Sequence, residues 1–111
     1  DVIIVTMTEF GRTSKENGGG GTDHAEASTI FVAGGAVKGG VYNCDTNSWK
    51  DGDMFSKRGR YLKRNTDFRG IFGDIFTKHF GDDPSILDSI MPGYTFAKED
   101  APSEFQSLGF L

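Results

Sequence analysis

Residues 2–40 read VIIVTMTEFGRTSKENGGGGTDHAEASTIFVAGGAVKGG, and this stretch decides the fold class. Its first segment, Val2–Val5, is a continuous run of β-branched residues, which predicts a strand buried on both faces. Such strands occur mostly in parallel sheets that helices cover, so we expect an α/β fold. Ligands of these sheets bind beyond the carboxyl ends of the strands. Glu9 and Arg12 follow the strand at that end, so the sequence predicts a site there.

A polar loop after this strand carries the glycines of residues 18–21 and then Asp23 and His24. Four consecutive glycines give the backbone high conformational freedom and allow close approach to a ligand. The loop lacks the Gly-Lys-Ser/Thr ending of a phosphate-binding loop, so we do not expect nucleotide binding by that route. Carboxylate oxygen and imidazole nitrogen are both ligands for zinc, manganese or iron. Taken alone, the Asp23-His24 pair favours a surface turn with an N-capping Asp23 over a metal site.

The rest of the chain predicts two more strands and two helices. The clearest helix begins near Thr66 or Asp67 and ends at His79 or Phe80, because its apolar residues recur on one helical face. Gly81 follows as the expected C-cap. The other expected elements are a strand at Thr29–Ala33, a turn into a short third strand within Val37–Tyr42, a short helix at Ser85–Met91 and an irregular, docked tail at Tyr94–Leu111.

The length of 111 residues allows one small domain with one core. A strand buried on both faces needs neighbours on both sides, yet the downstream chain predicts few further strands. We therefore expect an α/β sheet flanked by helices that is incomplete without an upstream segment of the same protein. The upstream remainder is then the first expected partner.

The charge and composition exclude several other functions. A net charge of −4 gives no electrostatic reason to expect nucleic acid as a partner. One local exception, residues 57–64, has five basic residues in eight positions, and it predicts either a solvated face paired with acidic residues or an anion-binding patch. The single Cys44 excludes an internal disulfide and a cysteine zinc cluster. No apolar run has the length of a membrane span.

Three segments together carry a family resemblance: TMTEFGRTSKENGGGGTDHAEASTIFVAGGAVKGGVY, NTDFRGIFGDIFTKHFG and the closing SLGFL. In this order they resemble the C-terminal part of bacterial proteins in domain-of-unknown-function family 1501, which are placed in the alkaline phosphatase/sulfatase superfamily. The resemblance spans almost the whole chain. It implies that residues 1–111 are the C-terminal segment of a single alkaline-phosphatase-like domain, within a protein several times longer.

The resemblance also implies a metal site. Phosphopentomutases and related mutases of the superfamily have an Asp-His-Gly motif after a strand and a second His before another strand, and these residues bind catalytic metals. Glu9-Phe10-Gly11 lies at the first position and His24 at the second. Glu9, Asp23 and His24 are therefore the expected ligands of a divalent metal (zinc, manganese or calcium), although Phe10 supplies no ligand. Arg12 and Lys38 are the expected residues for binding a small anionic substrate.

The implied activity is metal-assisted hydrolysis of phosphate or sulfate esters, with a nucleophile that lies outside this chain. The first alternative is a non-catalytic binding or structural protein that retains the fold after losing metal ligands, and Phe10 is the residue that favours it. The second alternative is a small self-contained module that binds an anionic partner through residues 57–64. Export signals are common in the family, so the resemblance implies a location in the periplasm or at the cell surface.

Overall fold

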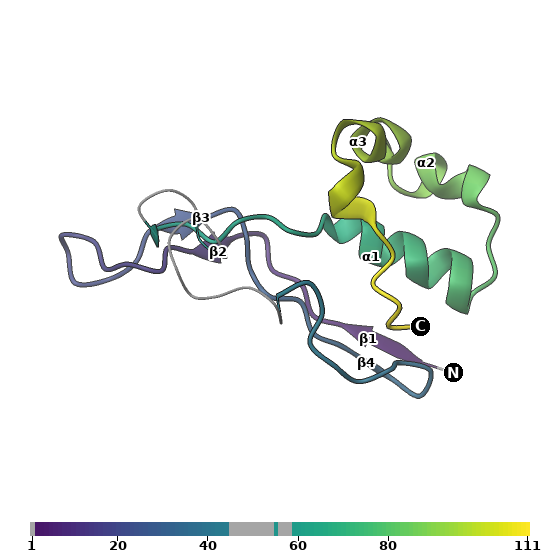
Figure 1. Ribbon diagram of the computed structural model, residues 1–111, viewed down its shortest axis with the longest axis horizontal. Helices are drawn as coiled ribbons and strands as arrows, with labels where there is room; N and C mark the ends of the chain where they lie inside the picture. Colours follow the sequence, from purple (N-terminus) through teal and green to yellow (C-terminus); the bar gives the residue numbers. More distant parts are fainter. Residues whose placement is uncertain (1, 45–54, 56–58) are drawn as a thin grey trace. The chain divides into compact units, whose positions relative to one another are not determined.

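The computed structural model describes residues 2–44, 55 and 59–111, which fall into two compact units. The first unit comprises Asp1–Gly35 with Cys44–Arg64, and the second comprises Ala36–Asn43 with Asn65–Leu111. Figure 1 labels the main elements. The strands are β1 (Ile3–Val5), β2 (Gly11–Arg12), β3 (His24–Ala25) and β4 (Val32–Gly34). The helices are α1 (Phe68–Asp74), the π-helical turn η2 (Ile75–His79), the 3-10 turn η3 (Pro84–Ile86), α2 (Leu87–Ile90), α3 (Tyr94–Asp100) and the 3-10 turn η4 (Pro102–Phe105).

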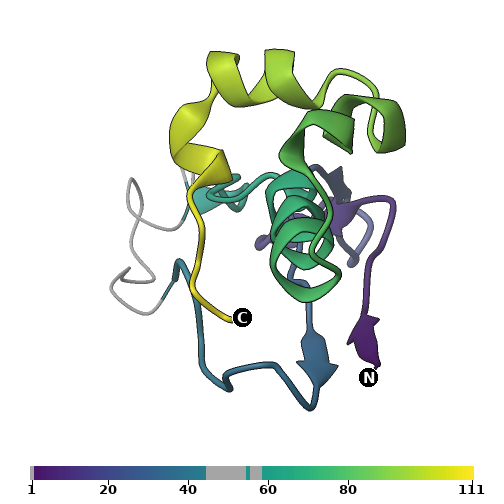
Figure 2. The ribbon, with the colours of Figure 1, turned by 90° about the vertical axis from the view of Figure 1, so that its right-hand side faces the viewer.

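The first unit contains a two-stranded antiparallel sheet in which β1 pairs with β4, with Ile4 opposite Ala33. The two strands lie side by side in Figure 2. The strands expected at Val2–Val5 and Thr29–Ala33 are therefore present as β1 and β4, although β4 begins later than predicted. The described sheet differs from the expected parallel, doubly covered one, because Val2 is 69% exposed and Ile4 is 62% exposed. A ribbon of two strands can cover only one of its faces.

No strand forms at Val37–Tyr42 among the described residues, so that prediction was wrong. Here the backbone N–H of Lys38 donates to the carbonyl of Phe110 at 2.8 Å. The ring of Tyr42 meets the ring of Phe110 edge-on, with the centroids 6.3 Å apart. The C-terminal segment thus supplies the partners that a strand would have found in a sheet.

The second unit is helical, and its main helix is confirmed. Asp67 precedes α1 as an N-cap, and its carboxylate accepts a hydrogen bond from the Arg69 backbone N–H at 2.9 Å. The turn η2 continues α1 to His79, and Gly81 follows with φ = 77°, as a C-cap glycine should. Gly73 permits close packing, because a Cβ there would lie 2.7 Å from the hydroxyl of Tyr94.

The tail was predicted to be irregular, but it forms α3 and η4. Figure 1 shows α2 and α3 following one another and η4 returning to α1. Expected docking of the tail is confirmed, since Phe105 and Phe110 are buried. The buried apolar side chains all belong to this unit: Ile71, Ile75, Leu87, Phe105 and Phe110. In the described residues, no helix has both the length and the apolar character needed to cross a membrane.

Candidate functional site

A hairpin formed by β2 and β3 carries most of the predicted site residues. Arg12 lies directly opposite His24, and Gly11 lies opposite Ala25. One face of the hairpin is closed by backbone, because a Cβ on Gly11 would lie only 1.8 Å from the carbonyl oxygen of Ala27. Directly opposed residues of an antiparallel pair project from the same face. Arg12 and His24 therefore share the face that this backbone does not cover.

Phe10 lies against both of these side chains. Its ring centroid is 4.3 Å from that of the His24 imidazole, and the two planes are tilted by 30°. The guanidinium carbon of Arg12 lies 5.3 Å from the same ring. Phe10 directly precedes β2, two residues before Arg12, and its ring meets the Arg12 guanidinium there. The result is an exposed cluster of a cation, an aromatic ring and an imidazole.

The carboxylate of Asp23 is engaged by protein groups on both oxygens. Its Oδ2 pairs with the guanidinium of Arg60, and its Oδ1 accepts a hydrogen bond from Asn17 Nδ2 at 2.8 Å. The buried Thr13 fixes the backbone beside it, since the Thr13 hydroxyl accepts from the Asp23 N–H at 3.1 Å. Asp23 is therefore a structural contact of the hairpin in this arrangement, and both of its oxygens already have a protein partner.

The Gly-rich loop is organised by Asn17. The side-chain oxygen of Asn17 accepts hydrogen bonds from the N–H groups of Gly19 at 2.9 Å and Gly21 at 3.1 Å. Gly20 has φ = 77°, a conformation that glycine adopts without steric cost. The loop thus turns around an amide side chain, and its backbone amides at Gly19 and Gly21 are already used.

The contacts above do not include two of the predicted residues, Glu9 and Lys38. Glu9 precedes Phe10 in the chain and is exposed. Lys38 belongs to the second unit, where its Nζ donates to the carbonyl of Leu111 at 3.1 Å. Within residues 2–44, 55 and 59–111, no group of three His, Cys, Asp or Glu side chains could hold a metal ion. The donor types of Glu9, Asp23 and His24 suit a divalent metal, but the described residues alone do not form its site.

The basic run of residues 57–64 is described only in part, because residues 57 and 58 lie outside the described residues. Arg60 pairs with Asp23, and Arg64 pairs with Glu26 at 2.7 Å. This agrees with the interpretation that the run partners acidic residues.

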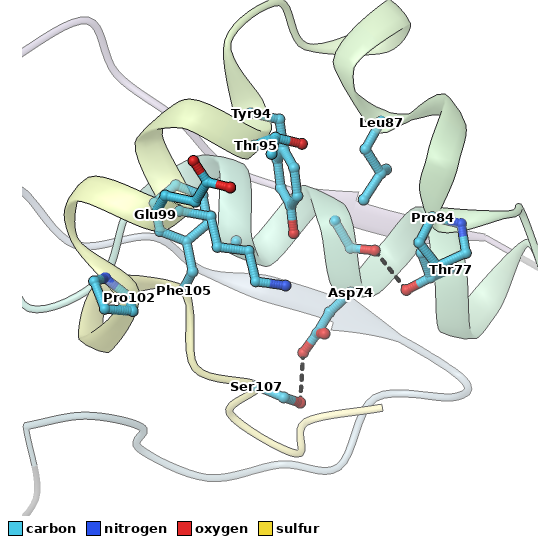
Figure 3. Close-up of a pocket in the computed structure, with 13 residues that line it drawn as sticks. Asp74, Thr77, Pro84, Leu87, Tyr94, Thr95, Glu99, Pro102, Phe105 and Ser107 are labelled. Carbon is cyan, nitrogen blue, oxygen red and sulfur yellow. Dashed lines mark hydrogen bonds between the residues drawn. The ribbon is translucent and has the colours of Figure 1, made fainter.

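A cleft of about 680 Å³ lies in the second unit between α1, α3 and the C-terminal segment. Figure 3 shows the side chains of Tyr94, Asp74 and Ser107 pointing into it. The Ser107 hydroxyl donates to Asp74 at 2.8 Å, and Lys78 also pairs with Asp74 at 3.1 Å. Burial raises the pKa of Tyr94 above its usual value, and the nearby charges of Asp74 and Asp88 raise it further. Asp74, Tyr94 and Ser107 thus line the cleft with polar groups.

Sequence reasoning did not assign Phe10, Thr13, Asn17 or Arg60 to the site. For Phe10 the available signal was its short separation from Arg12, two residues further along the chain. Asn17 is followed directly by glycines, and an Asn before Gly is a local sequence signal for a turn. The contact between Arg60 and Asp23 spans 37 residues and had no local signal.

Comparison with known proteins finds one matching family model, which covers residues 1–60 and therefore includes the whole hairpin. The family is described as "Protein of unknown function (DUF1501)". No curated protein matches the chain, and no solved structure matches it.

Proposed function

The chain belongs to the DUF1501 family of proteins of unknown function, and we propose that it is the C-terminal part of a sulfatase-like or phosphatase-like protein of the alkaline phosphatase superfamily. The proposed activity of the whole protein is hydrolysis of phosphate or sulfate esters. The observation that carries this proposal is the cross-strand pair of Arg12 and His24 on one exposed hairpin face. A guanidinium next to an imidazole offers several N–H donors to an anionic ester group.

Exposed apolar groups of the first unit support the need for further polypeptide. β1 has one strand partner among the described residues, and Val2, Ile4 and Phe31 are each more than 60% exposed. A two-stranded ribbon is marginally stable alone, so additional strands would stabilise it. In the proposal, an upstream part of the same protein extends this sheet, completes the alkaline-phosphatase-like domain and supplies the nucleophile.

Any divalent metal would have to draw ligands from that same upstream part. Glu9, Asp23 and His24 are the residues of this chain proposed to contribute, and the oxygens of Asp23 also bond to Arg60 and Asn17. Lys38 remains a proposed substrate contact, and its Nζ would then release the Leu111 carbonyl. The protein is proposed to act in the periplasm or at the cell surface, which fractionation of cells would test.

The test uses the full-length protein loaded with zinc, manganese or calcium. Metal content and hydrolysis of an aryl phosphate and an aryl sulfate are measured for the wild type, His24→Ala, Arg12→Gln and the control Arg64→Gln. Arg64 is a surface arginine paired with Glu26, so its variant makes the same charge change outside the cluster. We expect turnover that His24→Ala and Arg12→Gln abolish and Arg64→Gln preserves. Absence of turnover with every metal would contradict the proposal.

The contacts of the hairpin favour one second candidate, a non-catalytic binding protein of the same fold. Phe10 stands where the mutases have a metal-binding histidine, and its ring packs on the imidazole of His24. Asp23 is already neutralised by Arg60. This candidate predicts that the full-length protein binds an anion but does not turn over either ester.

A further inference from the structure

Arg12 differs from the other arginines whose ion pairs the structure describes. Arg60, Arg64 and Arg69 each pair with a carboxylate. Arg12 donates one N–H to the backbone carbonyl of Thr22 at 3.0 Å, and it has no carboxylate partner in the described part of the chain. A guanidinium carries five N–H donors, so most of the Arg12 donors remain available. The carbonyl contact holds the side chain in place without neutralising its charge.

His24 is held in a similar way. Phe10 covers one face of the imidazole. Neither ring nitrogen of His24 makes a hydrogen bond with a residue that the structure describes. The described contact of the His24 side chain is therefore made by the face of its ring, and the edge that carries the two nitrogens stays open to a ligand.

The acidic residue next to His24 is already paired. Asp23 pairs with the guanidinium of Arg60. This pair reduces the repulsion that an incoming anion would meet next to Arg12 and His24.

From these contacts we propose that Arg12 and His24 bind a tetrahedral oxyanion directly, without a metal, and that Phe10 is the positioning residue for the imidazole. The ligand class is a phosphate or sulfate group, either as a free ion or as the anionic part of an ester. Arg12 supplies a two-pronged donor, and His24 supplies a third N–H from the opposite strand. The inference rests on the proposed function in one respect: it names how the proposed ester site holds its anionic group.

The test measures binding of inorganic phosphate, inorganic sulfate and an aryl phosphate to the full-length protein after EDTA treatment, by calorimetry and by the NMR signals of the His24 ring. We expect binding in EDTA and a perturbed His24 signal. Arg12→Gln should weaken binding by about tenfold or more, because it removes charge-assisted hydrogen bonds. Arg12→Lys should lie between, and the control Arg64→Gln should bind as the wild type does. Binding of the free ions alone, or of the ester alone, would identify the source of the group.

Phe10 has its own readout. Phe10→Leu should weaken phosphate binding and remove the ring-current shift of the His24 signals. Phe10→Tyr keeps an aromatic ring, so it should retain both the phosphate binding and the ring-current shift. Equal weakening by Arg12→Gln and Arg64→Gln, or a strict need for added metal, would overturn the inference. Metal-free binding without ester hydrolysis would leave this inference standing and refute the hydrolase. Ester hydrolysis without metal-free binding would refute this inference and leave the proposed hydrolase standing.

Discussion

The ring of Phe10 lies on the imidazole of His24, with the centroids 4.3 Å apart, and so joins the two sides of the Gly-rich loop. The contact joins Phe10, whose side chain cannot bind a metal, to His24, whose imidazole can. Its consequence is that the imidazole has one face against an aromatic ring and its nitrogens at an open edge.

Replacing Phe10 by histidine should create a metal site. The substitution places a second imidazole beside His24, at a separation from which two nitrogens can reach one zinc ion with bonds of about 2.0–2.1 Å. We expect zinc affinity to rise by about tenfold or more over the wild type, since each added ligand contributes binding energy. Calorimetric titration of the full-length protein measures it. The apolar control Phe10→Leu should gain nothing, and an unchanged affinity in Phe10→His would contradict the geometry.

Gly11→Ala should destabilise the hairpin. The new Cβ would lie 1.8 Å from the Ala27 carbonyl oxygen and 2.6 Å from its carbon, so backbone must move. We expect a loss of about 2–4 kcal/mol in the free energy of unfolding of the first unit. Urea unfolding followed by hydrogen exchange of the β2 and β3 amides measures it. Gly35→Ala is the matched control, because a Cβ at Gly35 meets nothing within 4 Å; an equal effect of both variants would refute the packing argument.

Asp67→Ala should destabilise the second unit. Asp67 is buried, caps α1 and forms a two-pronged ion pair with Arg69, with contacts of 2.9 and 2.7 Å. Its removal leaves Arg69 without this carboxylate, at a cost of about 2–3 kcal/mol. Asp67→Asn retains a capping oxygen but loses the charge, and it should cost less. Thermal unfolding compares the three proteins, and identical stability of both variants would show that the cap contributes nothing.

Asp88 should titrate below the usual carboxyl range. The side chain of Thr95 and then its backbone N–H donate hydrogen bonds that lower the pKa of Asp88. Because the folded pKa is below the unfolded one, the stabilising contribution is present above the unfolded value and is lost as the pH falls through the folded value. NMR titration of the carboxyl group measures it. Thr95→Val should raise the pKa towards its usual value, and Thr95→Ser should preserve it; no difference between these variants would contradict the assignment.

Local signals predicted the helical part of the fold well. The spacing of Phe68, Phe72 and Phe76, with Asp67 before them, predicted a helix that the structure confirms. α3 was missed because its start depends on a contact from outside the segment, where Asp88 accepts a hydrogen bond from the Thr95 backbone at 3.1 Å. A search for periodicity within the tail contains no such information.

The strands and the site were predicted less completely. The expected strand at Val37–Tyr42 is absent from the described residues. Lys38 instead contacts the C-terminal segment, where its Nζ donates to the carbonyl of Leu111, 73 residues further along the chain. The pairing of Arg60 with Asp23 spans 37 residues, and no local pattern predicted it. Pairing of charges across such distances depends on how the chain folds back, which composition and spacing do not encode.

By itself, the sequence determined the properties that depend on neighbouring residues. These are the family signature over residues 1–60 and the cap and apolar face of α1. Only the tertiary structure placed Arg12 opposite His24 in a hairpin and decided which side chains of this hairpin have partners. It neutralised Asp23, placed Phe10 against His24 and left Arg12 with a carbonyl as its described hydrogen-bond partner. The physical reason is that a residue type fixes which bonds a side chain can form, whereas the folded chain fixes which of those bonds are already made.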